Sequence, residues 1–503
     1  MLNNFLKKPY WFAFVSGILS FCAVLHMVFL LAWVCYVLFF IFLKAKTIKQ
    51  SIQVGIAFGA GLSIPTFYWM IPGAEKFTGA SVVYGLLVFL LSSLIFCVYW
   101  AVIGTSVNLV RVSLRSPMLS VLLNALLVSS VWTLGEAGLN SIFPGMPWFA
   151  YNTGFGVLKN LSAIQLASVF GLPVISFVIV FVNFLISEFV AARQWKQLLV
   201  PGSIMLVYML IGYTILVGYK ESINRSNTIK VAILAENFPP EMKWDNNNGN
   251  ILVNRLLELE KEAVRLKPQL ALWSESSVPW TYRTDDDFVK EVCRISASAG
   301  ITHVIGINSD YSEKQVCNSV YCLLPDGLVA GRYDKRFLLD FIEKPVGGIL
   351  IPFLSGDGSS ACPGDYAQPL NTPFGKAGIM ICNEATLEKS PEDMIKKGAQ
   401  FFLTLSNDGW FRDSYIVGLH FYNLRLRAIE TRKDIAVNSN YGISGLVEAS
   451  GRIQMQQQSS SPFIKLVNIH PNNFKYNSFL FRKLFLGVCA MIVIVFSVLK
   501  FRT

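Results

Sequence analysis

The chain has 503 residues, of which 53% are hydrophobic and only 15% are charged, and this composition excludes an ordinary soluble protein. The formal net charge of +11 does not indicate nucleic-acid binding, because the basic residues lie in short loops between apolar segments and form no basic-aromatic motif. The nine cysteines and four histidines show no metal-ligand spacing, so neither a metal nor a cofactor is expected.

Eight apolar segments are predicted to cross a membrane, because each supplies close to the roughly 20 apolar residues that a spanning helix needs. They are two short helices within 10–43 that turn near His26, and then 52–70, 82–109, 118–141, 164–190, 198–219 and 483–500. The intervening region has the composition of a globular domain. We therefore expect a membrane domain at 1–220, an extramembrane domain at 221–478 and a final span at 479–503.

Basic residues in the short loops predict the orientation of these spans. With eight spans, the five basic clusters fall on one side of the membrane: Lys7 and Lys8; Lys44, Lys46 and Lys49; Arg111 and Arg115; Arg193 and Lys196; Lys500 and Arg502. The opposite short loops hold only Lys76 and Lys159. An excess of basic residues marks the cytoplasmic side, so both termini are expected in the cytoplasm and the globular domain outside. The first span lacks a small-residue cleavage site and is interpreted as an uncleaved anchor.

Glu136 lies near the outer end of the predicted span at 118–141, where a carboxylate is costly. A rigid turn at 143–148 follows and ends on Trp148. Two interpretations remain open. Either these two residues line a substrate cleft, or Glu136 pairs with a backbone group and Trp148 belongs to the interfacial aromatic belt.

From residue 228 onwards, short β-rich runs alternate with amphipathic helices, which predicts a layered α/β domain whose sheets are covered by helices. The expected strands are 229–234, 270–273, 303–307, 320–324, 328–332, 375–381, 401–405, 435–438 and 442–447, and the expected helices are 251–266, 288–298, 390–397 and 416–431. The strands at 320–324 and 328–332 form a hairpin around Pro325-Asp326-Gly327.

Three reactive side chains follow predicted strands: Glu275, Lys335 and Cys382. Taken singly, they are better explained as a buried core cysteine and as solvated or ion-paired charges. Together they complete an acyl-transfer site. A glutamate can accept the thiol proton, a lysine can favour the thiolate and stabilise an oxyanion, and the cysteine can hold the acyl group as a thioester.

This order of glutamate, lysine and cysteine resembles the nitrilase superfamily, which has a four-layer αββα domain. Membrane spans before and after such a domain make the chain similar, over nearly its whole length, to the family of bacterial apolipoprotein N-acyltransferases. The matching stretches are Asn237-Phe238-Pro239-Pro240 through Lys243-Trp244-Asp245, Trp273-Ser274-Glu275-Ser276, Tyr333-Asp334-Lys335, Ile381-Cys382-Asn383-Glu384, 405–411, 425–430 and 438–443.

The resemblance implies that Glu275 is the base, Lys335 the electrostatic stabiliser and Cys382 the nucleophile. It also implies supporting roles for Glu343, Glu384 and Asn383, and substrate contacts for Trp244 and Trp410; Trp148 and Glu136 are further candidates for such contacts. The implied donor is a membrane phospholipid, and the implied acceptor is a lipoprotein whose N-terminal cysteine carries a diacylglyceryl group. The implied protein is a monomer without cofactors in a bacterial inner membrane, with its catalytic domain in the periplasm.

The sequence departs from the family pattern at Asn383, where an aromatic residue is usual, at 340–343, and at Arg412, which replaces a glycine. These departures concern the mouth of the acyl-chain site and its lid, expected at 337–351. Two other functions remain open: a membrane-anchored carbon–nitrogen hydrolase that uses water, and a transporter or scaffold without catalysis. Disulfide pairing also remains open among Cys293, Cys317, Cys322 and Cys362, although a bridge between Cys317 and Cys322 has poor geometry across one short strand.

Overall fold

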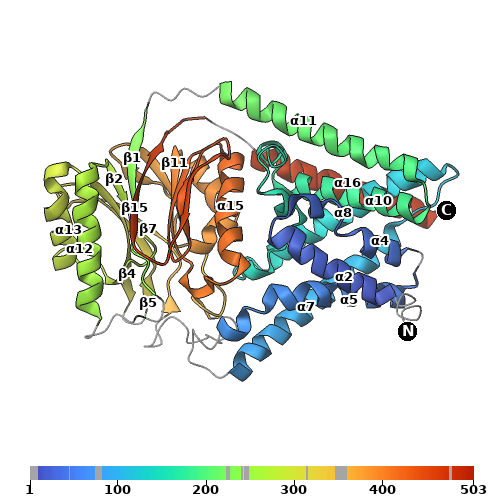
Figure 1. Cartoon of the computed structure of the whole chain (residues 1–503), viewed down its shortest axis with the longest axis horizontal. Helices are drawn as coiled ribbons and strands as arrows, with labels where there is room; N and C mark the ends of the chain where they lie inside the picture. Colours follow the sequence, from blue (N-terminus) through green and yellow to red (C-terminus); the bar gives the residue numbers. More distant parts are fainter. Residues whose placement is uncertain are drawn as a thin grey trace.

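The computed structural model describes residues 9–44, 46–73, 82–221, 227–239, 242, 248–312, 315–345, 360–474 and 478–502. A bundle of apolar helices and a domain with two stacked sheets lie side by side (Figure 1). The two parts correspond to the membrane and extramembrane regions that the composition indicates.

Within the described ranges, five helices are long and apolar enough to cross a membrane: α7 (Val82–Val110), α8 (Pro117–Ile142), α10 (Leu172–Ala191), α11 (Leu199–Glu221) and α16 (Ser478–Arg502). Two shorter apolar stretches, Tyr10–Leu25 and Phe29–Leu43, match the predicted short pair. They comprise α2 (Pro9–Ser20), η1 (Phe21–Leu25), α3 (Phe29–Ala32) and α4 (Val37–Leu43). Helix α5 (Ile48–Phe67) has 20 residues but carries Lys49, Gln50 and Gln53. By length and composition, five helices of the described ranges are therefore candidate spans, and the predicted number of eight is not confirmed.

The span predicted at 164–190 is shorter in the structure. Helix α10 begins only at Leu172, and the residues before it form turns and the short helix α9 (Ala167–Phe170). Gly171 ends α9 with φ +69°, and Pro173 stands in the first turn of α10. A left-handed glycine cannot continue a right-handed helix, and a proline is best tolerated in a first turn, so the chain restarts there.

The extramembrane domain contains two sheets. The first has the order β15-β1-β2-β4-β5-β8, with β3, β6 and β7 attached to it; the second has the order β14-β13-β12-β11-β10-β9. The strands of the first sheet are β1 (Ile229–Ala235), β2 (Leu270–Leu272), β3 (Val278–Thr281), β4 (Thr302–Ser312), β5 (Gln315–Cys317), β6 (Ser319–Leu323), β7 (Val329–Asp334), β8 (Ser360–Ala361) and β15 (Phe463–Ile469). Those of the second are β9 (Leu370–Thr372), β10 (Gly375–Ile381), β11 (Phe401–Asn407), β12 (Ile435–Asn440), β13 (Ile443–Val447) and β14 (Ile453–Gln458).

Helices cover the outer faces of both sheets and complete four layers. α12 (Gly249–Leu266) and α13 (Asp287–Ser296) cover the first sheet, and α14 (Lys389–Lys396) and α15 (Tyr415–Thr431) belong to the second. Helix α15 lies between its sheet and the membrane helices (Figure 1). Fully buried aliphatic side chains such as Val231, Leu272, Ile379 and Leu403 fill the space between the sheets. The predicted αββα architecture is thus confirmed.

Strand direction explains why the reactive residues gather at one edge of the sheets. Strands β1, β2 and β4 are parallel, and β7 is antiparallel to β6, which is antiparallel to β4, so β7 runs in the same direction as β2. In the second sheet, β10, β11 and β12 are parallel. Residues that follow β2, β7 and β10 therefore leave the sheets at their carboxyl ends, where sites of parallel sheets form.

Arg425 of α15 ties the two domains together. Its Nε donates to Gly451 O (2.6 Å), and its Nη1 donates to Leu158 O (3.0 Å) and to Lys159 O (2.8 Å). The side chain is buried, and the acceptors in 158–159 belong to the membrane domain. Charge-assisted hydrogen bonds to backbone carbonyls hold α15 in a fixed place against the helices.

Glu260, on the inner side of α12, predicts a pH-dependent stability. It is fully buried, its two oxygens have no hydrogen-bond partner among the described residues, and His303 Nε2 lies 3.7 Å away. Burial raises the pKa of Glu260 to about 8 and lowers that of His303 to about 4, so the pair is neutral at neutral pH. The folded state therefore holds a proton that the unfolded chain releases above its ordinary pKa of 4.5. The opposite shift of His303 offsets this loss below its own ordinary pKa of 6.5, so stability falls as the pH rises from 6.5 to about 8.

We expect Glu260→Gln to raise the melting temperature at pH 8 by several degrees and to flatten its decline with pH. A gain of 1 kcal/mol corresponds to roughly 2–4 °C for a domain of this size. Thermal unfolding in detergent between pH 5 and 9 measures the effect. Glu258→Gln, on the exposed side of the same helix, is the control and should change neither quantity. An unaltered pH profile for E260Q would contradict the assignment.

Candidate active site

Cys382 follows β10 directly and begins the helical turn η6 (Cys382–Thr386). Its φ of +51° is left-handed, which costs a non-glycine residue roughly 1–2 kcal/mol and persists only when neighbours enforce it. Two side chains do so. Glu384 Oε2 accepts from Ile381 N (2.8 Å), and His420 Nε2 lies 2.8 Å from the carbonyl oxygen of Cys382.

Lys335 lies between two carboxylates. Its Nζ is 3.5 Å from Glu275 Oε1 and 2.7 Å from Glu343 Oε1, and the lysine side chain is 1% exposed. Asn318 Nδ2 donates to the same Glu275 oxygen (2.8 Å), and Leu339 N donates to Glu343 Oε2 (2.7 Å). Glu343 thus makes the shorter contact with the ammonium. Glu275 makes the longer one through Oε1, which leaves its Oε2 to accept a proton.

The electrostatics of the site depend on burial. Burial raises the pKa of the Cys382 thiol well above its ordinary value; Glu275 raises it further, and Lys335 opposes both. Burial also raises the pKa of Glu275, against the attraction of Lys335. For Lys335 burial disfavours the charge, but Glu343, Glu275 and Cys382 outweigh it and raise the pKa, so the lysine stays charged. A protonated thiol, a carboxylate of increased basicity and a fixed cation therefore stand together.

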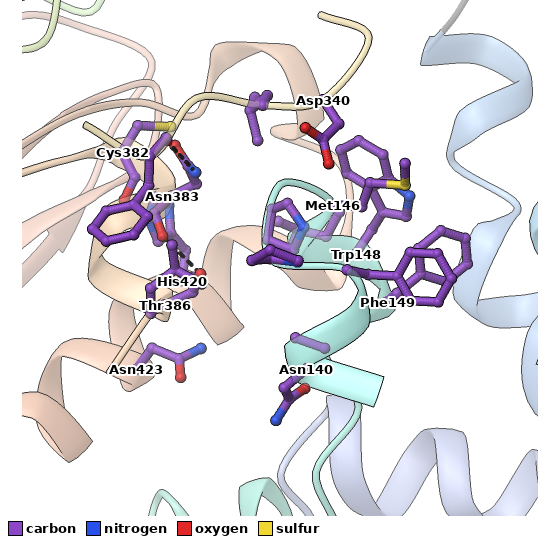
Figure 2. Close-up of a pocket in the computed structure, with 18 of the residues that line it drawn as sticks. Asn140, Met146, Trp148, Phe149, Asp340, Cys382, Asn383, Thr386, His420 and Asn423 are labelled. Carbon is purple, nitrogen blue, oxygen red and sulfur yellow. Dashed lines mark hydrogen bonds between the residues drawn. The ribbon is translucent and has the colours of Figure 1, made fainter. Parts of the chain in front are cut away.

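These side chains line one large cavity of about 1410 Å³ between the two domains. Figure 2 shows Cys382 and His420 on one side and Trp148 and Phe149 on the other. Leu87 and Leu91 of α7 also line the cavity, although they are 60% and 61% exposed on the outer surface of the helix bundle. The cavity therefore extends from the reactive thiol to the apolar face that a bilayer would cover.

The structure brings most of the predicted site residues to this cavity. Glu275, Lys335, Cys382, Glu343, Asn383, Trp148 and Glu136 all line it. Trp244 lies outside the described residues. The backbone of Trp410 lies in the turn η7 (Gly409–Phe411), but its side chain is not among the described ones.

Glu384 is fully buried and acts as a bridge within the domain. Its Oε1 accepts from the Tyr333 hydroxyl (2.8 Å) and from Arg336 N (2.9 Å), and its Oε2 accepts from Ile381 N (2.8 Å). It therefore fixes the chain on both sides of Lys335 and just before Cys382. This position is compatible with the supporting role predicted for Glu384.

Glu136 has a different setting. A single oxygen, Oε1, accepts from Thr153 N (2.8 Å), Thr153 Oγ1 (2.6 Å) and Trp132 Nε1 (3.0 Å). These bonds fasten the segment after Trp148 to α8. Glu136 thus lines the cavity, as the substrate-cleft interpretation expects. One of its oxygens also accepts a backbone N–H, as the alternative interpretation expects.

His420 was not predicted from the sequence, and Asp408 lies in the matching stretch 405–411 but had no predicted role. The ring of His420 spans from Asp408 Oδ1 (2.8 Å from Nδ1) to the carbonyl of Cys382, and both partners can only accept. Two acceptors require two donors. Although burial opposes the charge, Asp408 and Cys382 O raise the pKa of His420, in keeping with an imidazolium. Two features of the sequence could have pointed to His420. It is one of only four histidines in the chain, and it stands eleven residues after a Ser-Asn-Asp-Gly string.

The loop after Lys335 contacts the membrane domain. Asp340 N donates to Gly145 O (2.8 Å), within the turn that carries Trp148. A Cβ on Gly145 would collide with the Asp340 carboxylate, so any other residue there would have to displace that side chain. Of the expected lid at 337–351, residues 337–345 are described, and they close one side of the cavity.

One disulfide joins Cys317 of β5 to Cys362, next to β8, while Cys293 and Cys322 are free thiols. This pairing settles the question that the sequence left open. It ties the segment that returns after the loop to the strand beside Asn318.

Comparison with known proteins agrees with this geometry. The family model "Apolipoprotein N-acyltransferase N-terminal domain" matches residues 16–185, and the model "Carbon-nitrogen hydrolase" matches residues 240–462. The chain belongs to the apolipoprotein N-acyltransferase family. Relatives of that name include those of Geobacter metallireducens (26% identity, covering 64% of each chain) and Photobacterium profundum (26% identity, covering 85% of this chain and 82% of the relative). The alignment with the Geobacter relative spans less than two thirds of that protein.

Among solved structures, the chain is similar to Nit3 of Saccharomyces cerevisiae, a member of branch 10 of the nitrilase superfamily. The identity is 19% and the TM-score 0.39, covering 52% of this chain and 94% of that one. The match to the carbon–nitrogen hydrolase model falls within the extramembrane domain of this apolipoprotein N-acyltransferase family member.

Proposed function

We propose that the protein transfers a fatty acyl chain from a membrane phospholipid to the α-amine of a lipoprotein whose N-terminal cysteine carries a diacylglyceryl group. The observation that carries this proposal is the cavity, which joins Cys382, Glu275 and Lys335 to the apolar, outward-facing side of α7. Removing an acyl chain from a bilayer costs about 0.8 kcal/mol per CH₂. A site that can be reached from the bilayer avoids that cost.

In the first half-reaction, Glu275 accepts the proton of the Cys382 thiol as the sulfur attacks the ester carbonyl of the phospholipid. The Lys335 ammonium stabilises the tetrahedral oxyanion. The C–O bond then breaks, the proton passes from Glu275 to the leaving alkoxide, and a lysophospholipid departs. The acyl group remains on the sulfur as a thioester.

In the second half-reaction, the lipoprotein amine attacks the thioester carbonyl while Glu275 accepts an amine proton. The C–S bond breaks, the thiol regains a proton, and an amide leaves. Amine must compete with water for the thioester, and a cavity walled by Trp148, Phe149 and the loop around Asp340 limits the access of water.

Placement in the cell follows from the loop charges. We take the chain to be a multi-pass protein of a bacterial inner membrane, with both termini in the cytoplasm and the catalytic domain in the periplasm, as the basic clusters favour. The membrane domain would be 1–220, the catalytic domain 221–478 and the last span 479–503. Since the three reactive side chains come from one chain, a monomer suffices.

Mass spectrometry of the purified protein tests the proposal. Incubation with phospholipid should add one acyl mass to the peptide that contains Cys382, and a diacylglyceryl peptide with a free amine should discharge it as an amide. Rapid turnover of a small amide without lipid would favour a carbon–nitrogen hydrolase instead. Full biological activity of Cys382→Ala would favour a transporter or scaffold.

A further inference from the structure

A second part of the same cavity lies away from the thiol, where α15 meets α16. His420, Asn423 and Arg427 all line the cavity and lie on one face of α15, spaced three and four residues apart. Figure 2 shows the first two of them on the same side as Cys382. At 1.5 Å of rise per residue, Arg427 lies about 10 Å along the helix from His420, which touches the nucleophile's carbonyl.

Arg427 has unused hydrogen-bonding capacity. The residue is 1% exposed, yet its Nε and Nη1 have no hydrogen-bond partner among the described residues. Glu430 contacts only the third nitrogen, with Oε2 3.0 Å from Nη2. A buried guanidinium with unfilled donors is costly unless a ligand completes it, and phosphate oxygens are the acceptors that it suits best.

Basic and apolar side chains meet in this part of the cavity. Arg482 and Lys483 line the cavity near the start of α16, and Leu486, one turn further along, lines it as well. The cavity there spans the boundary between the charged and the apolar part of a spanning helix. Acidic groups are also present: Glu388 and Glu392 contact Arg482, at 2.5 Å and 3.6 Å. Basic groups at such a boundary meet lipid phosphates.

We propose that Arg427 binds the phosphate of the glycerophospholipid whose acyl ester Cys382 attacks. The inference rests on the proposed function and adds a subsite to it. In one lipid molecule, only a few bonds separate the ester carbonyl from the phosphate. Holding the phosphate at Arg427 therefore sets how far the ester reaches along α15 towards the thiol, and distinguishes a phospholipid from a neutral diacylglycerol.

The test compares two donors that share the same acyl chains: phosphatidylglycerol and diacylglycerol, each in mixed micelles with the full-length protein. The initial rate of thioester formation on Cys382 is followed by mass spectrometry. For Arg427→Gln we expect the rate with the phospholipid to fall roughly 10- to 100-fold more than the rate with diacylglycerol. Where R427Q does not fold, Arg427→Lys, which keeps the charge with fewer donors, should show the same bias to a smaller degree.

Arg425→Gln is the matched control. Arg425 is also a buried arginine on the same helix, but its Nε and Nη1 donate to backbone carbonyls and it does not line the cavity. It should affect both donors alike. Equal losses with both donors for R427Q would overturn the proposal and make Arg427 structural. Inhibition of diacylglycerol-driven acylation by inorganic phosphate, abolished in R427Q, would assign the site to the free anion; insensitivity assigns it to the lipid headgroup. Failure of wild-type protein to form an adduct from either donor would instead refute the proposed function.

Discussion

Replacing Glu275 with glutamine should lower the rate of Cys382 acylation by about 10²- to 10⁴-fold, the usual contribution of a general base. Glutamine has the same shape and keeps an oxygen to accept from Asn318, so the fold should persist. The loss comes from the missing proton acceptor, because burial leaves the thiol protonated at rest. Rapid mixing of purified protein with phospholipid, followed by mass spectrometry of the Cys382 peptide, measures the rate.

The pH dependence sharpens this prediction. Burial raises the pKa of Glu275, and the base works only when it is ionised, so the wild-type rate should rise as the pH passes that raised value. The remaining rate of E275Q should lack this rise. Glu236→Gln is the control, since Glu236 is a buried carboxylate after β1 that bonds to Ser274 and does not line the cavity. Near-normal acylation by E275Q would show that another group accepts the proton.

Replacing Lys335 with methionine should abolish activity and also destabilise the fold. Without the ammonium, the Glu275 and Glu343 carboxylates are left buried without their cation, and breaking a buried pair in this way costs roughly 3–5 kcal/mol. The double variant K335M/E343Q removes one of these charges. It should regain much of the stability while remaining inactive, because the oxyanion still lacks its cation.

Thermal unfolding and acylation rates of the single and double variants separate the two effects. If K335M/E343Q regained activity together with stability, Lys335 would serve only the fold. If the single variant kept its melting temperature, the two carboxylates would be neutralised without the lysine, and Lys335 would not be needed for the stability of the fold. Glu343→Gln alone completes the cycle and measures the coupling between lysine and glutamate.

The sequence predicts those features of the structure that depend on residues close together in the chain, and it fails for features that depend on distant residues. Strand β10 has the predicted bounds, because its buried apolar run Ala377–Ile381 is a clear local pattern for a strand in a covered sheet. Strands β14 and β15 were missed. They lie at the edges of the two sheets, and their exposed positions hold glutamines, Lys465 and Asn468, which dilute the apolar alternation.

The site shows the same division. The order of Glu275, Lys335 and Cys382 could be read from strand ends, since parallel strands bring their carboxyl ends to one edge. The contact of His420 with Cys382 joins residues 38 positions apart in sequence on different elements, and the approach of Asp340 to Gly145 joins two domains. Such contacts arise from packing in three dimensions, and no local sequence pattern predicts them.

The wall that faces Cys382 comes from a part of the chain that carries none of the reacting groups. Residues 143–149 of the membrane domain close the cavity opposite the thiol, and the Asp340–Gly145 bond secures the seam. Under the proposed function the helices are more than an anchor, because they decide whether water or the amine reaches the acylated sulfur. An extramembrane domain severed from them would retain the proposed nucleophile, base and cation but be open to solvent, and its expected product would be a free fatty acid in place of an amide.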